Sequence, residues 1–340
     1  MTTPTPELPK KALLIGCNYI GTPFQLGGCV NDIVNMSHVL TDALDYDLQN
    51  IFILRDDNSR MMPTRSNILA ALNYLVSQSS KLSEIWVHYS GHGSQIRDSG
   101  NEEKDGFDEV IVPVDFRKTG LITDDELFNL IKNVKCRMIL IFDSCSSGSM
   151  CDLQNMFEFD GTQIIKTVDG VKKIENPNVF VYSGCKDNQS SADTYSVEQA
   201  QGVGAFTDSL LHSFRINHCS TDVLKLYMDT CKYIKSRGYS QTPVFTSSCD
   251  KPAHIIARPS LNPQKPVAPI EIVVKTKEMT EMTTVQSTTT QNKTLKVVIS
   301  NPFHNAFSVP TKMSVLPTTM PLGNLNSVKS KRIIETTLNK

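Results

Sequence analysis

Two short polar runs contain the residue types that a thiol nucleophile needs. The first reads His88-Tyr-Ser-Gly-His92-Gly, and the second reads Asp143-Ser-Cys145-Ser-Ser-Gly. Each run follows an apolar segment of strand size, and the carboxyl ends of parallel strands deliver their residues to a common crevice. An imidazole that meets a thiol there can take its proton, so that the thiolate attacks a carbonyl carbon. The pairing of His92 with Cys145 therefore predicts a cysteine protease.

Hydrolysis of an amide also needs donors for the tetrahedral oxyanion, set in place before the reaction. The backbone amides of Gly93 and Cys145 are the candidates for this role. Glycine at positions 91 and 93 lets the backbone approach a substrate closely. His88 lies earlier in its strand, where we interpret it as a packed core histidine.

An aspartate is close to each part of this candidate site. Asp143 precedes Cys145 by two residues, and in a strand that spacing puts both side chains on one face. Asp32 opens the helix expected after the first strand, at the same edge of the sheet. Two carboxylates in a partly buried pocket repel each other unless a guanidinium or an ammonium joins them with charge-assisted hydrogen bonds. Asp32 can equally serve as a plain helix cap.

A second set of acidic residues lies apart from the two motifs. It consists of Asp108, Asp124, Asp125 and Asp152. Carboxylate oxygens suit calcium far better than a transition metal. The spacing is not that of an EF-hand, and Asp124 with Asp125 can instead favour the start of a helix through the helix dipole.

The rest of the pattern predicts one alternating α/β domain. Apolar runs predict six strands, at residues 11–17, 51–54, 85–89, 138–143, 178–183 and 242–247. Helical spacing of apolar residues separates them, at about residues 30–44, 64–75, 124–132, 204–217 and 220–236. Such alternation predicts a mostly parallel six-stranded sheet with helices on both faces. Residues 110–114 indicate a small accessory strand, because Pro113 disfavours a central position.

Two segments break this alternation. Residues 144–176 are too long for an ordinary connection, and loops of that length are usually functional or disordered. The segment follows the candidate nucleophile directly and carries Lys166, Lys172 and Lys173. From about residue 259 the chain becomes rich in threonine and proline, which predicts a weakly ordered tail.

Composition favours a soluble intracellular enzyme. The 340 residues carry a net charge of −1, so we expect neither a nucleic-acid partner nor a membrane. The apolar runs are shorter than a membrane span, and the first ten residues contain no apolar core of a secretory signal. Nine scattered cysteines fit neither a disulfide framework nor a zinc cluster. We expect a cytoplasmic protein, and a basic cluster at residues 329–332 leaves nuclear access open.

Six blocks of sequence occur in the order found in one family of peptidases. They read LGGCVND from Leu26, HYSGHGSQ from His88, DGFDEVIVPVDF from Asp105, DSCSSGS from Asp143, SGCKDNQSSAD from Ser183 and GAFT from Gly204. On these blocks, residues 11–258 resemble a type I metacaspase. The order of the large-subunit and small-subunit blocks is that of type I, and the animal caspase signature Q-A-C-[RQG]-G is absent.

The resemblance implies the caspase-like (caspase-hemoglobinase) fold. Its peptidase domain would consist of a large-subunit-like part at 11–160 and a small-subunit-like part at 177–258, with a cleavable linker between them. A short extension of residues 1–10 precedes this domain, in place of the family's Pro- and Gln-rich prodomain. Residues 259–340 would be the tail.

The resemblance also implies an activity and a set of site residues. It implies a calcium-stimulated, usually monomeric endopeptidase that cuts protein or peptide substrates after Arg or Lys. The pocket for the basic side chain would be lined by Cys29, Asp32, Ser90 and Asp143. The family's calcium-ligand positions are occupied here by Asp108, Asp124, Asp125 and Asp152. Self-cleavage in the linker is expected after Lys166, Lys172 or Lys173.

One departure keeps other functions open. Metacaspases usually carry histidine directly after the nucleophile, and this chain has Ser146 there. The catalytic histidine lies in the other block, so the dyad itself is kept. A catalytically weak caspase-like scaffold that binds partners is the first alternative. The second is a cysteine hydrolase that acts on small amides.

Overall fold

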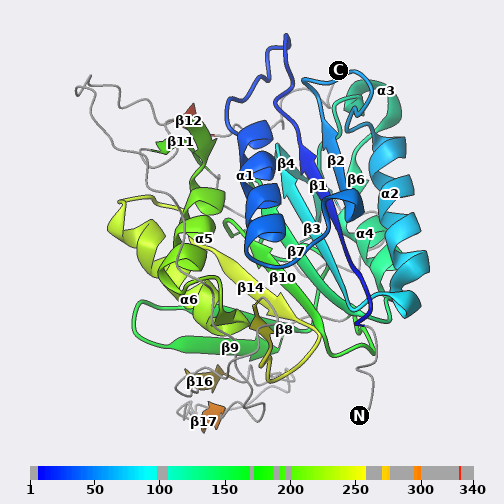
Figure 1. Cartoon of the computed structure of the whole chain (residues 1–340). Helices are drawn as coiled ribbons and strands as arrows, with labels where there is room; N and C mark the ends of the chain where they lie inside the picture. The colour runs from blue at the N-terminus through cyan, green and yellow to red at the C-terminus, as the bar shows by residue number, and fades with distance from the viewer. Residues whose placement is uncertain are drawn as a thin grey trace, which may run out of the picture.

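A large mixed sheet forms the centre of the molecule (Figure 1). The computed structural model describes residues 7–97, 106–168, 172–186, 192–196, 201–257, 270–275, 295–299 and 329–330. The strands of the central sheet are β1 (Lys10–Gly16), β2 (Ile51–Arg55), β3 (Glu84–Ser90), β7 (Arg137–Asp143), β8 (Asn155–Phe159), β9 (Ile164–Val168), β10 (Val179–Ser183), β14 (Val244–Ser247), β16 (Ile270–Lys275) and β17 (Leu295–Ile299).

Three smaller sheets, six α-helices and two short 3₁₀ helices, Leu48–Asn50 and Ser79–Lys81, complete the described structure. The small sheets contain β4 (Gly93–Arg97), β5 (Phe107–Ile111) and β6 (Ile122–Thr123), then β11 (Ala192–Ser196), β12 (Gln201–Gly204) and β18 (Lys329–Ser330), then β13 (Thr221–Asp222) and β15 (Ile255–Ile256). The helices are α1 (Cys29–Asp42), α2 (Arg65–Gln78), α3 (Phe116–Thr119), α4 (Asp124–Ile131), α5 (Ala205–Ile216) and α6 (Val223–Ser236).

The central sheet has the order β17-β16-β9-β8-β14-β10-β7-β3-β1-β2. Its strands β2, β1, β3, β7 and β10 are mutually parallel. All seven residues of β3 are buried, as is typical of a parallel strand covered on both faces. Each of the six expected strands is present, but β14 is antiparallel to β10. The expectation of a six-stranded, mostly parallel sheet is therefore wrong in strand number, and the sheet is mixed.

The four strands of the central sheet that we did not expect, β8, β9, β16 and β17, come from segments that we expected to be irregular. Strands β8 and β9 form an antiparallel hairpin inside residues 144–176. Its turn contains Asp160, whose carboxylate accepts hydrogen bonds from the amides of Thr162 and Gln163, and Gly161 with a φ of 104°. An Asp-Gly pair between two apolar runs is a strong hairpin signal. Strand β16, from the expected tail, pairs with β9 and β17.

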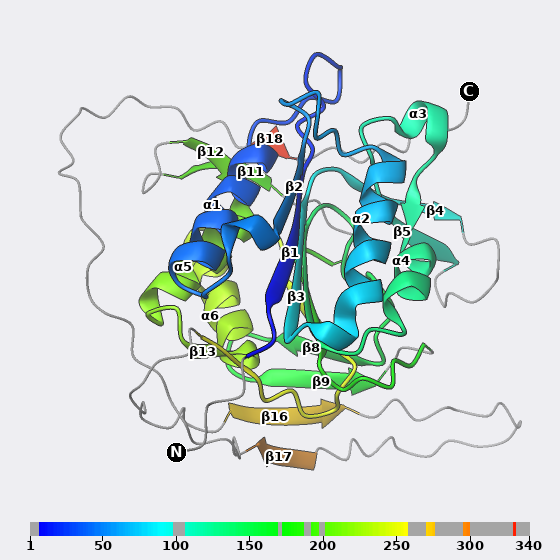
Figure 2. The ribbon, with the colours of Figure 1, turned by 45° about the vertical axis from the view of Figure 1, so that its right-hand side comes forward.

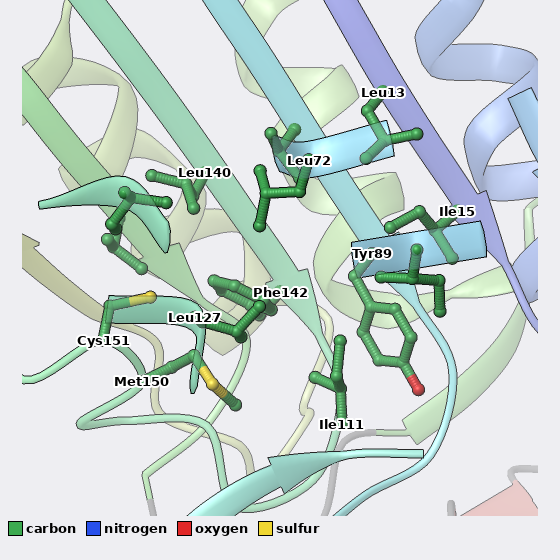
Figure 3. Packing of buried hydrophobic residues seen from close by; sticks show 14 of the residues in the cluster. Leu13, Ile15, Leu72, Tyr89, Ile111, Leu127, Leu140, Phe142, Met150 and Cys151 are labelled. Carbon is green, nitrogen blue, oxygen red and sulfur yellow. The ribbon is translucent and has the colours of Figure 1, made fainter. Parts of the chain in front are cut away.

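Helices cover both faces of the sheet, as expected. Figure 2 shows α1, α5 and α6 on one face and α2 with α4 on the other. On the α2 face, Leu13, Leu72 and Leu140 belong to one buried apolar cluster (Figure 3). On the opposite face, the buried Trp86 ring of β3 packs against Phe214 of α5 with ring centroids 6.2 Å apart.

Parts of the expected ends lie outside the described residues. These are residues 1–6 of the N-terminal extension and, in the tail, residues 259–269, 276–294, 300–328 and 331–340. Within the described part of the chain, no helix combines the length and the apolar character that crossing a membrane requires.

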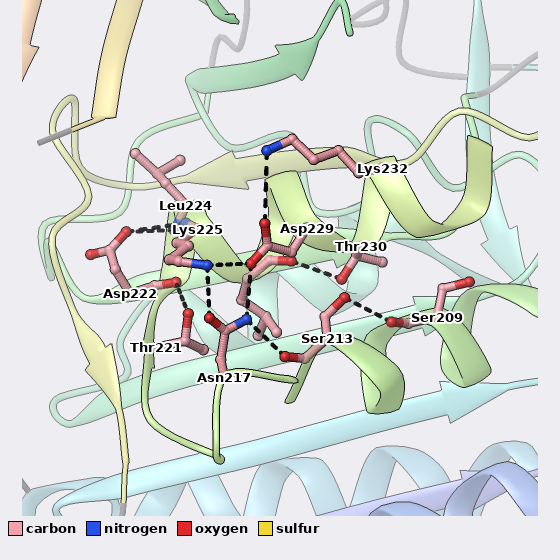
Figure 4. A network of polar contacts seen from close by, with 11 residues as sticks. Ser209, Ser213, Asn217, Thr221, Asp222, Leu224, Lys225, Asp229, Thr230 and Lys232 are labelled. Atoms are coloured by element: carbon pink, nitrogen blue, oxygen red, sulfur yellow. Dashed lines mark hydrogen bonds and ion pairs between the residues drawn. The ribbon is translucent and has the colours of Figure 1, made fainter. Parts of the chain in front are cut away.

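A polar network joins the end of α5 to the start of α6 (Figure 4). The Asn217 amide donates to the Ser213 carbonyl and to the Asp229 carboxylate, each at 2.9 Å. The Lys225 ammonium donates to the Asn217 side-chain oxygen at 2.7 Å. At the start of α6, the buried Asp222 carboxylate accepts from the amides of Leu224 and Lys225 at 2.8 and 3.3 Å, so it caps this helix.

We expect Asp222→Ala to lower the free energy of unfolding by about 1–2 kcal/mol, since an N-cap carboxylate satisfies amides that have no other partner within the helix. Urea denaturation measures this change. Asp47→Ala is the matched control, because Asp47 caps a three-residue 3₁₀ turn at an exposed position. Equal losses in the two variants would contradict the role of Asp222.

Candidate active site

The two predicted motifs meet at the carboxyl ends of β3 and β7. Ser90 and Asp143, the last residues of these strands, are partners in the register. Beyond them, the Gly91 amide donates to the Asp143 carbonyl at 3.3 Å. A Cβ atom at Gly93 would lie 2.1 Å from the Cys145 carbonyl oxygen. Only glycine therefore allows the His92 motif to lie this close to the backbone of Cys145.

The imidazole of His92 is held in one orientation. Its Nε2 lies 2.7 Å from the Phe24 carbonyl oxygen. A carbonyl can only accept, so Nε2 carries the ring proton and Nδ1 is the nitrogen that can take up another. The sequence pattern did not identify Phe24, because it acts through its backbone in a loop that is distant along the chain.

Two tyrosines fix the backbone of His92. The His92 amide donates to the Tyr19 hydroxyl at 3.0 Å, and the Tyr89 hydroxyl donates to the His92 carbonyl at 2.6 Å. The Tyr19 ring also lies against the imidazole, with centroids 4.7 Å apart. Burial raises the pKa of both tyrosines well above the ordinary value, so they remain neutral donors at neutral pH.

The loop of Cys145, the candidate nucleophile, is held by a residue that lies just beyond the end of β10. The Cys185 thiol donates to the Ser144 carbonyl at 3.2 Å. Burial raises the pKa of Cys185 to about 12, so this thiol keeps its proton. Ser146, directly after Cys145, has a φ of 46°, in the left-handed region that few residues other than glycine adopt. Both Cys145 and His92 are buried.

Three of the four predicted pocket residues come together. The Ser90 hydroxyl donates to Asp32 at 2.5 Å, and both residues are fully buried. A Cβ atom at Gly204 would lie 2.0 Å from an Asp143 oxygen and 2.8 Å from an Asp32 oxygen, so the two carboxylates flank this glycine. Cys29, the fourth, is the first residue of α1 and is buried one turn before Asp32.

The start of α5 supplies donors to both carboxylates. The Gly204 amide donates to Asp32 at 2.8 Å. The amide and the hydroxyl of Thr207 donate to one oxygen of Asp143, at 3.0 and 2.8 Å. The partial positive charge of a helix N-terminus also stabilises anions placed there. These contacts supply hydrogen-bond donors to two carboxyl groups that are buried close together.

His88 supports this arrangement. Its Nε2 lies 3.2 Å from the Thr207 hydroxyl. Because that hydroxyl donates to Asp143, it accepts from the His88 ring N–H. His88 is fully buried, as expected of a core histidine, and it also contacts the pocket through Thr207. The sequence did offer a signal for Thr207, since this residue belongs to the GAFT block. The spacing of the block alone, however, assigned no role to Thr207.

Two of the four aspartates in the second set pair with a lysine. The Lys172 ammonium donates to the carboxylates of Asp125 and Asp152, the latter at 2.6 Å. Asp124, at the start of α4, is fully buried, and neither of its oxygens has a hydrogen-bond donor within the described chain. Burial, together with the adjacent Asp152, raises the pKa of Asp124 to about 10.

The remaining member of this set lies on β5. Asp108 is buried there beside Glu109, a neighbouring carboxylate that also raises the pKa of Asp124 and that the sequence pattern did not identify. Glu109 accepts from the Gln95 amide at 3.0 Å and from Ser149. Among the residues described, no group of three or more His, Cys, Asp or Glu side chains is arranged to hold a metal ion.

The three lysines expected in the linker differ in their surroundings. Lys166 belongs to β9, which is paired on both sides, and is only 6% exposed. Lys172 is engaged by the carboxylates, and Lys173 is exposed. Lys173 is therefore more accessible to a protease than Lys166 or Lys172.

Comparisons with known proteins agree with the motifs. A family model described as metacaspase, peptidase C14 domain, matches residues 10–154. Metacaspase-1A of Aspergillus oryzae is 33% identical over 291 aligned residues, which cover 72% of this chain and 68% of the relative. Metacaspase-1 of Saccharomyces cerevisiae is 34% identical over 290 residues, which cover 70% of this chain and 66% of the relative.

Other relatives extend further beyond the matched region. Metacaspase-1 of Cryptococcus neoformans is 35% identical over 246 residues, which cover 58% of this chain. The chain spans 54% of the length of that protein and 64% of metacaspase-1B from Aspergillus terreus. The mixed α/β fold with a central sheet between helices fits the caspase-like fold of this family. The chain belongs to the metacaspases.

Proposed function

We propose that this chain is a cysteine endopeptidase that uses a dyad of His92 and Cys145. The observation that supports this most directly is the hydrogen bond from His92 Nε2 to the Phe24 carbonyl, which leaves Nδ1 as the base. Nδ1 takes the thiol proton of Cys145, and the thiolate sulfur attacks the carbonyl carbon of the substrate. The amides of Gly93 and Cys145 are the proposed donors to the oxyanion.

The second half of the reaction returns the dyad to its starting state. His92 gives its Nδ1 proton to the leaving amine as the C–N bond breaks, which leaves an acyl thioester on Cys145. A water molecule then loses a proton to Nδ1 and attacks the thioester carbonyl. The carboxylic acid product leaves as the thiolate sulfur recovers the proton from His92, so every proton is accounted for.

The pocket supports a preference for Arg or Lys before the scissile bond. Asp32 and Asp143 are buried on either side of Gly204, close to the last residues of β3 and β7. A cationic side chain would be attracted to this pair of carboxylates, whereas an acidic side chain would be repelled. Peptide substrates are favoured over small amides, since such a charged pocket recognises a long basic side chain.

We expect peptides with Arg or Lys before the scissile bond to be cut at least about a hundredfold faster, as kcat/KM, than peptides with Asp there, because a good charge pair is worth a few kcal/mol. A fluorogenic peptide panel measures this preference. Cys145→Ala should lose several orders of magnitude of activity in the same assay. A preference for Asp, or unchanged turnover in Cys145→Ala, would contradict the assignment.

Thr207 offers a milder test of the pocket. Thr207→Val removes the hydroxyl that donates to Asp143, and a hydrogen bond to a charged group contributes about 1.5–3 kcal/mol. We expect KM for an Arg substrate to rise about tenfold, whereas Thr207→Ser should stay near the parent value. Thr246→Val is the matched control, since that buried hydroxyl has no partner among the described residues. Similar KM values in the two valine variants would contradict a role for Thr207.

We further propose that calcium activates the enzyme at the second acidic set. The donors are hard carboxylate oxygens, and the buried Asp124 has no hydrogen-bond donor among the described residues, which fits a divalent cation of this class. Asp124, Asp125 and Asp152 would hold the ion, with Asp108 and Glu109 on the adjacent β5. Bound calcium would supply positive charge that joins these carboxylates. Self-cleavage after Lys172 or Lys173 is proposed because Lys173 is exposed and Lys172 is its direct neighbour.

Excess chelator should abolish most peptidase activity, and millimolar calcium should restore it, because the bound ion would hold Asp124, Asp125 and Asp152, and with Asp152 the turn after Cys145, in one arrangement. Intact-mass analysis should then detect a cut within residues 160–176 of the active protein but not of Cys145→Ala. The double variant Asp124→Ala, Asp125→Ala should lose the calcium response while keeping its circular dichroism spectrum. Undiminished activity in chelator would leave these aspartates as helix-start residues only.

A further inference from the structure

The Lys172 ammonium is a cation that the chain itself places among the acidic residues. It donates to Asp125 of α4 and to Asp152, which lies in the turn after the nucleophile. The Lys172 side chain is only 14% exposed, and that of Asp152 is 9% exposed. Lysine is almost never buried to this extent unless carboxylates pair with it.

The position of this ammonium accounts for the absence of a ready-made metal site among the described residues. Asp125 and Asp152 direct carboxylate oxygens at Lys172 Nζ, and Asp124 packs against Asp152 without any donor of its own in the described chain. A divalent ion bound by the same oxygens would have to occupy the space of the ammonium. Two cations cannot be that close without strong repulsion in a partly buried site.

We propose that Lys172 is a tethered competitor of calcium: it occupies the cation position of the calcium-free protein and must leave before calcium can be bound by Asp124, Asp125 and Asp152. The inference rests on the proposed calcium site. Calcium binding and the release of Lys172 are then one event. A competing internal state lowers the apparent affinity of a ligand by the fraction of molecules that are competent to bind.

The competition has a second consequence for the linker. In the calcium-free protein Lys172 is tied to two carboxylates and is a poor target for any protease. Once calcium has displaced it, Lys172 becomes as accessible as its exposed neighbour Lys173. Calcium therefore makes available the residue at which self-cleavage is proposed, independently of any effect on the dyad.

Calcium titration by calorimetry tests the competition directly. The full chain carries Cys145→Ala throughout, so that no variant cuts itself. Lys172→Met should bind calcium at least about tenfold more tightly than the parent, which corresponds to about 1.4 kcal/mol. Lys173→Met makes the same change in charge one residue away, at an exposed position, and should stay within about twofold of the parent. Lys172→Arg keeps a cation at the site and should also not tighten binding by tenfold.

A measurement on the unmodified linker covers the case in which Lys172→Met does not fold. Calcium added to the Cys145→Ala chain should increase trypsin cleavage after Lys172, detected by mass spectrometry, relative to cleavage after Lys232, which lies on α6 and is already exposed. The competition is overturned if the parent binds calcium but Lys172→Met binds it no more tightly, or if calcium leaves cleavage after Lys172 unchanged. If neither the parent nor Lys172→Met binds calcium, the proposed calcium site itself is overturned, and the competition with it.

Discussion

The in-register parallel pairing of β3 with β7 is the constraint on which the site depends. This pairing makes Ser90 and Asp143 partners, and His92 and Cys145 each follow two residues later. Side chains alternate between the two faces of a strand, so a slip of one residue would turn Asp143 away from Ser90. The register is held by buried pairs such as Trp86 with Ile139, and these resist any slip.

Sequence patterns predicted the strands, which depend on neighbouring residues, and missed the contacts between residues that are distant in the sequence. The parallel strands that precede His92 and Cys145 were predictable, because a continuous apolar run indicates a strand that is buried on both faces. The β8–β9 hairpin was misread as a loop, although its Asp-Gly turn was a usable signal. The partners Phe24, Cys185 and Thr207 could not be identified, since each reaches the site through tertiary folding of a segment distant in sequence.

The protein compensates its two groups of carboxylates, one buried and one partly exposed at Asp125, by different means. At the first group, neutral donors from Ser90, Gly204 and Thr207 bind the carboxylates of Asp32 and Asp143. At the second group, an internal ammonium supplies the charge. A buried carboxylate needs one of these solutions, because desolvation otherwise raises its pKa until it takes up a proton. Asp124 has neither a hydrogen-bond donor nor a direct ion pair within the described chain, and burial together with the adjacent Asp152 raises its pKa.

The two groups are linked through a short and strained turn. Between Cys145 and Asp152 the backbone has positive φ angles at Ser146, Cys151 and Asp152, of 46°, 69° and 46°. Left-handed conformations of residues other than glycine each cost about 1–3 kcal/mol, so they persist only where the surrounding contacts impose them. One such contact is the pairing of Asp152 with Lys172 at one end of the turn, and another is the hydrogen bond from Cys185 to Ser144 at the other end. Under the proposed function, a cation that replaced Lys172 would act on the turn that carries Cys145, and this would give the acidic group a physical route to the thiol that does not pass through Asp32 and Asp143.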